Sequence, residues 1–88
     1  MKNINDPRNE YQLISELGYR YLQKQDVKDS YQPIFVMHHR RKKTLSYVKV
    51  IDHRIEDDFL MSITIKYSDD LVETLNSFAL DECLFRRI

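Results

Sequence analysis

Residues 59–67 decide the fold class, because apolar and aromatic residues stand at every second position of the stretch FLMSITIKY. The side chains predicted for a buried face are Phe59, Met61, Ile63, Ile65 and Tyr67. The polar residues that fall between them, and that would form a wet face, are Ser62, Thr64 and Lys66. A period of two predicts a β-strand with one face on the core and the other in water.

Two runs upstream of this stretch are rich in β-branched and aromatic residues, and they predict further strands at about 34–40 and 45–55. The second run is irregular, because Leu45 and Tyr47 would point to one face while Val48 and Val50 point to the other. We therefore expect a β-bulge there, or two partly covered faces. Together the three runs predict a three-stranded antiparallel meander.

A helix at about 7–25 is predicted ahead of the strands. Asp6-Pro7 is typical of a helix start, because aspartate accepts the free backbone N–H groups and proline costs nothing at the first helical position. Residues of one predicted stripe then recur at steps of three and four: Tyr11, Ile14, Gly18, Tyr21 and Leu22. A glycine within this stripe indicates close approach to a neighbouring backbone.

A second helix is predicted at about 69–80, with Ser68 as its cap and Asp69 and Asp70 in its first turn. An apolar tail over residues 80–88 follows it. The predicted fold is therefore α+β, in the order α-β-β-β-α, with the helices packed on one face of the sheet. At 88 residues the chain is expected to form a single compact domain, 1–88.

Composition limits the classes of function. Lysine plus arginine and aspartate plus glutamate number 14 each, so binding to DNA or to an acidic membrane would need a local patch rather than net charge. No apolar run approaches the length of a membrane span, and we expect no membrane partner. The single cysteine, Cys83, cannot form an internal disulfide, and residues 1–6 show no secretory signal. We expect a cytoplasmic protein.

Catalysis has little support in the sequence. His38 and His39 are adjacent in a predicted strand, so their side chains would leave on opposite faces and could not act as a local dyad. No spacing of cysteine and histidine predicts a metal site, and a chain with one glycine has no glycine-rich phosphate loop. We therefore expect neither enzyme activity nor a cofactor.

The most conspicuous charged feature is HHRRKK at residues 38–43, the predicted tip of the first hairpin. A basic tip could bind the phosphates of a nucleic acid or an acidic protein partner. The meander would bring Asp69-Asp70 to the same end, and would place residues 56–58 near Lys24 and Lys28 at the other end, so we expect charge compensation at both ends. The candidate residues for such partners are Arg40, Arg41, Lys42, Lys43, Lys49 and Arg54.

Apolar residues near the C-terminus exceed what one stripe of a short helix would bury. The candidate protein-interface residues are Leu80, Leu84, Phe85 and Ile88, with Arg86 and Arg87 as their rim. These side chains either fold back over the core or are buried against a partner, which could be a second copy in a homodimer.

The favoured function is a small non-enzymatic protein that binds another protein as a regulator, inhibitor or adaptor. Such a chain would suit an accessory protein of a phage or mobile element that acts on a host factor. Two alternatives stay open: a nucleic-acid-binding domain that uses the hairpin at 38–43, and a non-catalytic subunit of an enzyme complex.

Overall fold

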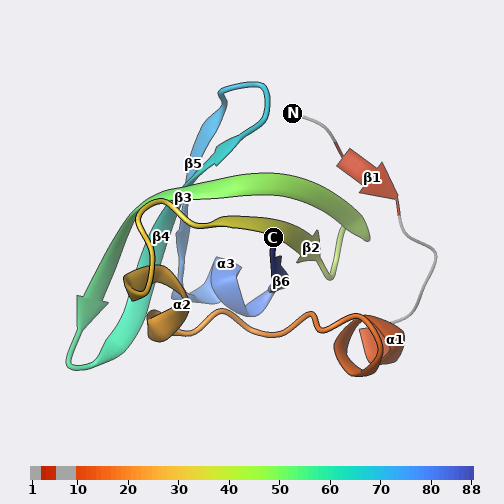
Figure 1. Ribbon diagram of the computed structural model, residues 1–88, viewed down its shortest axis with the longest axis horizontal. Coiled ribbons are helices and arrows are strands. Elements are labelled where there is room, and N and C mark those ends of the chain that lie inside the picture. Colours follow the sequence, from red (N-terminus) through yellow and green to blue (C-terminus); the bar gives the residue numbers. More distant parts are fainter. Residues whose placement is uncertain (1–2, 6–9) are drawn as a thin grey trace.

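A six-stranded antiparallel sheet forms the centre of the protein, and three short helices flank it (Figure 1). The computed structural model describes residues 3–5 and 10–88. Its elements are β1 (Asn3–Asn5), α1 (Glu10–Ser15), α2 (Lys24–Lys28), β2 (Ile34–His39), β3 (Thr44–Glu56), β4 (Phe59–Tyr67), β5 (Val72–Asn76), α3 (Ser77–Asp81) and β6 (Cys83–Arg87). The strand order is β5-β4-β3-β2-β6, and β1 pairs with the start of β3.

The α+β class is confirmed, but the three predicted strands are part of a larger sheet rather than a three-stranded one. Strands β2, β3 and β4 pair in sequence order and antiparallel, and their bounds agree with the predicted runs to within a residue. Of the two alternatives for the second run, the structure shows two covered faces, with Leu45 in one core cluster and Val48 and Val50 in the other; the register of β3 against β4 shifts only later, between Val50 and Asp52 and again between Arg54 and Ile55. Each extra residue turns the following side chains to new positions on the sheet.

The predicted first helix is wrong beyond its first turns, and its start at Asp6-Pro7 lies outside the described residues. Helix α1 ends at Ser15, and Gly18 adopts φ +78°, a left-handed conformation that ends helices. The Tyr19 N–H donates to the Leu13 carbonyl at 2.9 Å across this turn. A Cβ on Gly18 would meet nothing within 4 Å, so the glycine serves the backbone conformation and not the close packing we expected.

The predicted helix at 69–80 is also wrong. Asp70 adopts φ +70° in a tight turn, and residues 72–76 then run back along β4 as the strand β5. Helix α3 begins only at Ser77, where the Asn76 side chain accepts a hydrogen bond from the Ala79 N–H at 3.0 Å. The spacing of Leu71, Leu75 and Phe78 suits a helix, but the open edge of β4 offers backbone partners that local spacing does not reveal.

Both faces of the sheet carry core side chains, which corrects the expectation that the helices share one face. The larger cluster includes Phe35, Ile63, Ile65 and Phe85, and it packs with Val27 of α2 and Leu80 of α3. On the opposite face, a smaller cluster lies beneath α1 and the segment that follows it: Leu13, Tyr19, Val36, Leu45 and Leu84. Among residues 3–5 and 10–88, this second cover reaches only one end of its face, and the rest of that face is open.

Candidate functional site

One row of side chains crosses the uncovered part of the sheet. Cross-strand pairing places Val72 beside Lys66, Lys66 beside Lys49, and Lys49 beside Ile34. Ile88 continues the row, because its N–H donates to the Ile34 carbonyl at 3.0 Å. Alternation puts three further residues on the same face, and we call the whole set the open face: Ile34, Tyr47, Lys49, Arg54, Lys66, Val72, Arg86 and Ile88.

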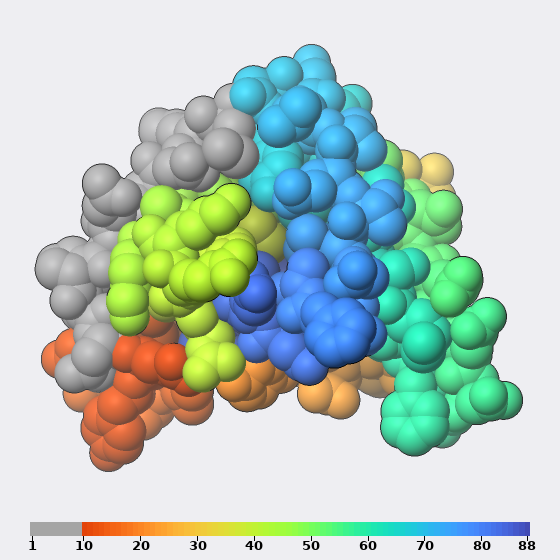
Figure 2. All heavy atoms as spheres, turned by 180° about the vertical axis from the view of Figure 1, so that it is seen from behind, coloured from red at the N-terminus to blue at the C-terminus, as the bar shows by residue number. Residues whose placement is uncertain are grey.

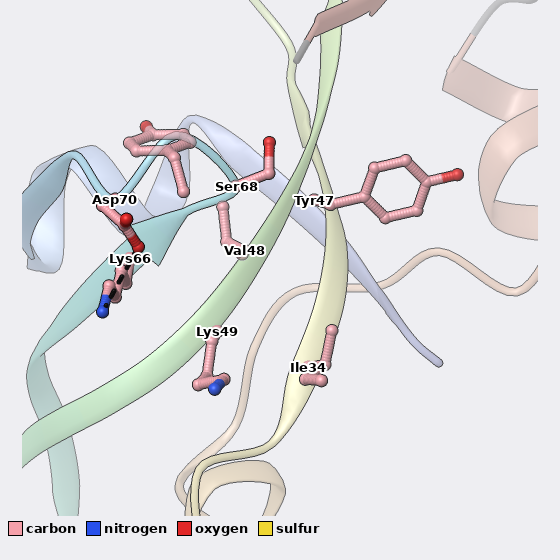
Figure 3. Close-up of a pocket in the computed structure, with 8 residues that line it drawn as sticks. Ile34, Tyr47, Val48, Lys49, Lys66, Ser68 and Asp70 are labelled. Atoms are coloured by element: carbon pink, nitrogen blue, oxygen red, sulfur yellow. Dashed lines mark ion pairs between the residues drawn. The ribbon is translucent and has the colours of Figure 1, made fainter. Parts of the chain in front are cut away.

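Apolar side chains on this face are unusually accessible to solvent. Ile34 is 44% exposed, Val72 51% and Ile88 68%, although each lies in or directly after a strand of the sheet. Tyr47 is 40% exposed and projects from β3 away from the sheet (Figure 3). A sheet face that packs against nothing normally carries polar side chains, so this face combines the composition of an interface with the exposure of a surface.

A shallow hollow of about 290 Å³ lies in the open face, between β3 and the end of β4 (Figure 3). Ile34 and Tyr47 supply apolar surface to its lining, and Lys49 supplies a charge. At its far side the Lys66 ammonium lies 3.4 Å from a carboxylate oxygen of Asp70. The complete lining is Ile34, Tyr47, Val48, Lys49, Lys66, Tyr67, Ser68 and Asp70.

The open face is cationic, although the chain as a whole has no net charge. Lys49 and Lys66 stand directly opposite each other on neighbouring strands, an arrangement that destabilises a sheet. Within residues 3–5 and 10–88, no ion pair involves Lys49. Arg54 lies 3.5 Å from Glu56, and Asp52 shares the face opposite Thr64. Because Lys66 is paired with Asp70, the unbalanced positive charge is centred on Lys49.

The predicted basic tip has a different environment. Arg40 donates through Nε to Glu10 at 3.0 Å and through Nη1 to the Asp81 carbonyl at 3.1 Å. The hydrogen bond to Glu10 raises the pKa of Arg40. Arg41 lies 3.4 Å from Glu82, while Lys42 and Lys43 are exposed. The two arginines therefore tie the hairpin to α1 and to the start of β6.

The acidic partners of the tip differ from those we expected. The turn between β4 and β5, which contains Asp69-Asp70, lies at another corner of the molecule (Figure 1), and the carboxylates beside the tip belong to Glu10 and Glu82. At the opposite end, the expected compensation is confirmed, because Lys24 forms an ion pair with Asp58. The hydrogen bond and charge of this lysine lower the pKa of Asp58.

The C-terminal candidates divide between the core and the surface. Leu80, Leu84 and Phe85 are at most 8% exposed, because residues 83–87 form β6 and pair with β2. Of the four candidate hydrophobes, Ile88 is the one that is exposed to solvent. Arg86 lies on the open face, and its guanidinium carbon is 5.4 Å from the centre of the Tyr19 ring.

The structure thus assembles its site from parts of both predicted sets. Lys49 and Arg54 from one set join Arg86 and Ile88 from the other on the open face, whereas residues 40–43 lie at the hairpin turn and Arg87 alternates to the other face. The other members of the open face are not among the site residues predicted from the sequence: Ile34, Tyr47, Lys66 and Val72. The period-two pattern of residues 59–67 contained the signal for Lys66, since it assigned this lysine to the wet face.

Burial shifts the pKa of two reactive side chains in opposite directions. The Cys83 thiol is 1% exposed, and burial raises its pKa to about 12, so it stays protonated at neutral pH. Burial is also the first cause that lowers the pKa of His39, with nearby Lys42 the next. Among the residues placed in the structure, no group of three or more histidine, cysteine and acidic side chains could hold a metal ion.

Comparisons of the chain with protein-family models, with curated proteins and with solved structures found no match. In the described ranges, none of the helices has the length and apolar character needed to cross a membrane. The physical character of the open face is therefore the basis for a proposal about function.

Proposed function

We propose that this chain is a non-catalytic protein-binding module, and that its open face binds a surface of another protein that is both acidic and apolar. The observation that carries the proposal is an uncovered sheet face on which Ile34, Tyr47 and Val72 are 40–51% exposed beside the opposed lysines Lys49 and Lys66. A regulator, inhibitor or adaptor would need such a face and no reactive group.

The exposed apolar area of the open face favours a protein partner. Burying an exposed aliphatic or aromatic side chain contributes about 25 cal/mol per Å² removed from water, and large exposed apolar patches mark interaction sites. Ile34 and Ile88 lie side by side on β2 and after β6, so their exposed surfaces are contiguous. A partner that covers them together with Tyr47 would gain more than one that touches isolated side chains.

The positive charge of the open face favours an acidic partner. Like charges that face each other across two strands cost roughly 0.2–1 kcal/mol, and in the described residues Asp70 pairs with Lys66 whereas no ion pair involves Lys49. A carboxylate from a partner would relieve this cost and would also steer association at low ionic strength. An acidic partner therefore fits this face better than a neutral or basic one.

A nucleic acid is the competing occupant, because Tyr47 beside lysines could stack a base. The ion pairs at the hairpin weaken that alternative, because Arg40 and Arg41, which were predicted to bind phosphates, already have Glu10 and Glu82 as partners. The two occupants differ in chemical composition, so a single cross-linking experiment distinguishes them.

The test places a benzophenone amino acid at position 47 of the full chain and irradiates the cells that express it. The matched control carries the same group at Phe59, an aromatic residue that is 70% exposed at the β3–β4 turn, outside the open face. We expect an adduct that resists nuclease and contains a second protein, at position 47 only, and we expect its loss when Lys49→Glu and Lys66→Glu are combined.

Two results would contradict the proposal. A nuclease-sensitive adduct at position 47 would assign the face to a nucleic acid. Adducts of equal yield at positions 47 and 59, or an adduct that survives both charge reversals, would show that the open face selects no acidic partner.

A further inference from the structure

The outer edge of β5 presents backbone groups that point away from the sheet. The Tyr67 N–H donates to the Leu71 carbonyl at 2.8 Å, and this bond sets the alternation of the β4–β5 ladder. Hydrogen-bonded pairs recur at every second residue, so the N–H and C=O groups of Val72 and Thr74 face outward. In the part of the chain that the structure describes, no strand pairs with this edge.

The opposite edge of the sheet is protected by the chain itself. Arg20 and Phe85 exchange two backbone hydrogen bonds, of 2.9 and 2.7 Å, along the outer side of β6. Strand β5 has no such cover and none of the usual deterrents to pairing, since residues 72–76 include no lysine, proline or bulge. Its one charged residue, Glu73, accepts a hydrogen bond from the Tyr67 hydroxyl at 2.8 Å and is thereby held on its own sheet.

We propose that β5 pairs antiparallel with β5 of a second copy of this chain, about a two-fold axis at Thr74. In this register Thr74 lies opposite its symmetry mate, so the outward groups of both threonines exchange hydrogen bonds, and Val72 lies opposite Asn76. The pair would extend the Thr64–Thr74 hydroxyl contact, 3.1 Å in one copy, across the axis. A shift to an axis at Glu73 would oppose two carboxylates, which destabilises that register.

The side chains at the two ends of β5 favour a second copy over an unrelated strand. Leu71, just before the strand, is 55% exposed, and Phe78, just after it, is 82% exposed. Antiparallel pairing about Thr74 places Leu71 of each copy beside residues 77 and 78 of the other. A two-fold axis makes this apolar contact twice, which is the self-complementarity of an isologous interface. Figure 2 shows the surface of β5 and α3, in blue, facing the viewer.

The dimer is independent of the proposed function, because it uses the backbone edge of β5 and leaves the hollow beside Tyr47 accessible. The two-fold axis of an antiparallel strand pair is perpendicular to the sheet. Both open faces would therefore lie on the same side of one continuous sheet, and a dimer would present two copies of the cationic face to a partner in parallel.

Cysteine cross-linking tests the register. Thr74→Cys should form a disulfide-linked dimer under a mild thiol oxidant, because residue 74 faces its own symmetry mate. Val72→Cys is the matched control: its symmetry mate is displaced by about 13 Å along the strand, beyond the reach of a disulfide. The native Cys83 is 1% exposed and does not compete. Equal cross-linking of the two variants, or none with Thr74→Cys, would overturn the proposal.

Light scattering across a dilution series tests the contacts at the strand ends. The wild type should approach twice the 10.7 kDa chain mass at high concentration. Leu71→Lys and Phe78→Glu should each weaken the dimer by about tenfold, and the two changes in one chain should restore it, since each lysine then faces a glutamate. Phe59→Glu, at an equally exposed aromatic away from β5, should leave the mass unchanged. Circular dichroism checks that each variant is folded, and a wild type that remains single-chain at roughly 1 mM would refute the dimer.

Discussion

Replacing Asp26 with alanine should destabilise the protein by about 3 kcal/mol, although this residue belongs to no functional face. The Asp26 side chain is only 8% exposed, and both of its oxygens accept hydrogen bonds from the Arg20 guanidinium. The same carboxylate accepts the Gln23 N–H at 2.7 Å, which satisfies a free donor at the start of α2. The residue therefore holds α2 and the segment that covers β6 in one arrangement.

The magnitude follows from what each group loses. Removing one partner of a fully buried ion pair costs about 3–5 kcal/mol, mostly because the other charge is left without water. Arg20 is 56% exposed, so water can hydrate its guanidinium after the substitution, and the lower end of that range applies. A domain of this size has a free energy of unfolding of roughly 4–13 kcal/mol, so the loss is a large fraction of its stability. Arg20→Met should destabilise the protein less than Asp26→Ala, provided that the buried Asp26 carboxylate keeps its hydrogen bond from the Gln23 N–H.

Urea unfolding followed by circular dichroism measures this loss. With a slope of roughly 1.2 kcal/mol per molar urea for a small domain, the midpoint of Asp26→Ala should fall by about 2–3 M. Asp26→Asn, which keeps the shape and removes the charge, should lie between the wild type and alanine. A loss below about 1 kcal/mol for Asp26→Ala would show that the pair is hydrated in solution, and would refute the reasoning from burial.

Four further outcomes follow from the described geometry. Gly18→Ala should cost about 1–2 kcal/mol in urea unfolding, and Gly18→Asn less, because the position has φ +78°. Leu84→Ala should cost about 3 kcal/mol and Ile88→Ala under about 0.5 kcal/mol in the same assay, since only the first side chain is buried. Iodoacetamide should modify Cys83, whose pKa is raised to about 12, only at the rate of unfolding, as mass spectrometry would show. Burial, with nearby cations, lowers the pKa of His39 below its ordinary 6.5, so the unfolded chain binds a proton at this residue more readily than the folded chain. The free energy of unfolding should therefore fall as the pH drops below about 6.5. His39→Gln should flatten that part of the curve of stability against pH.

The binding proposal and the dimer place different demands on the same sheet. A cationic face can meet an acidic partner only if nothing in the chain covers it, and α1 reaches only the end of that face near Leu13 and Leu84. A strand edge can pair with a second copy only if it stays free, and the described part of the chain covers the β6 edge but not that of β5. Both features follow from the small number of helical residues available to cover a six-stranded sheet.

The sequence by itself determined the central hairpins. Strands β2, β3 and β4 follow one another with short turns, so the alternation within each run and the local turns are enough to specify them. The irregular pattern at Tyr47-Val48 also indicated two covered faces, because Leu45 lies in one core cluster and Val48 and Val50 lie in the other. These features depend on residues that are neighbours in the chain.

Tertiary structure alone decided the two ends of the chain and the assembly of the open face. Residues 72–76 and 83–87 became strands because β4 and β2 had unpaired edges to offer, and a backbone partner outweighs the weak helical preference of their spacing. The open face combines Lys49, Lys66, Ile34 and Ile88 from four strands, and only the register between those strands makes them neighbours. Periodicity reports which side of a strand a residue occupies, whereas the hydrogen bonds between strands decide what stands beside it.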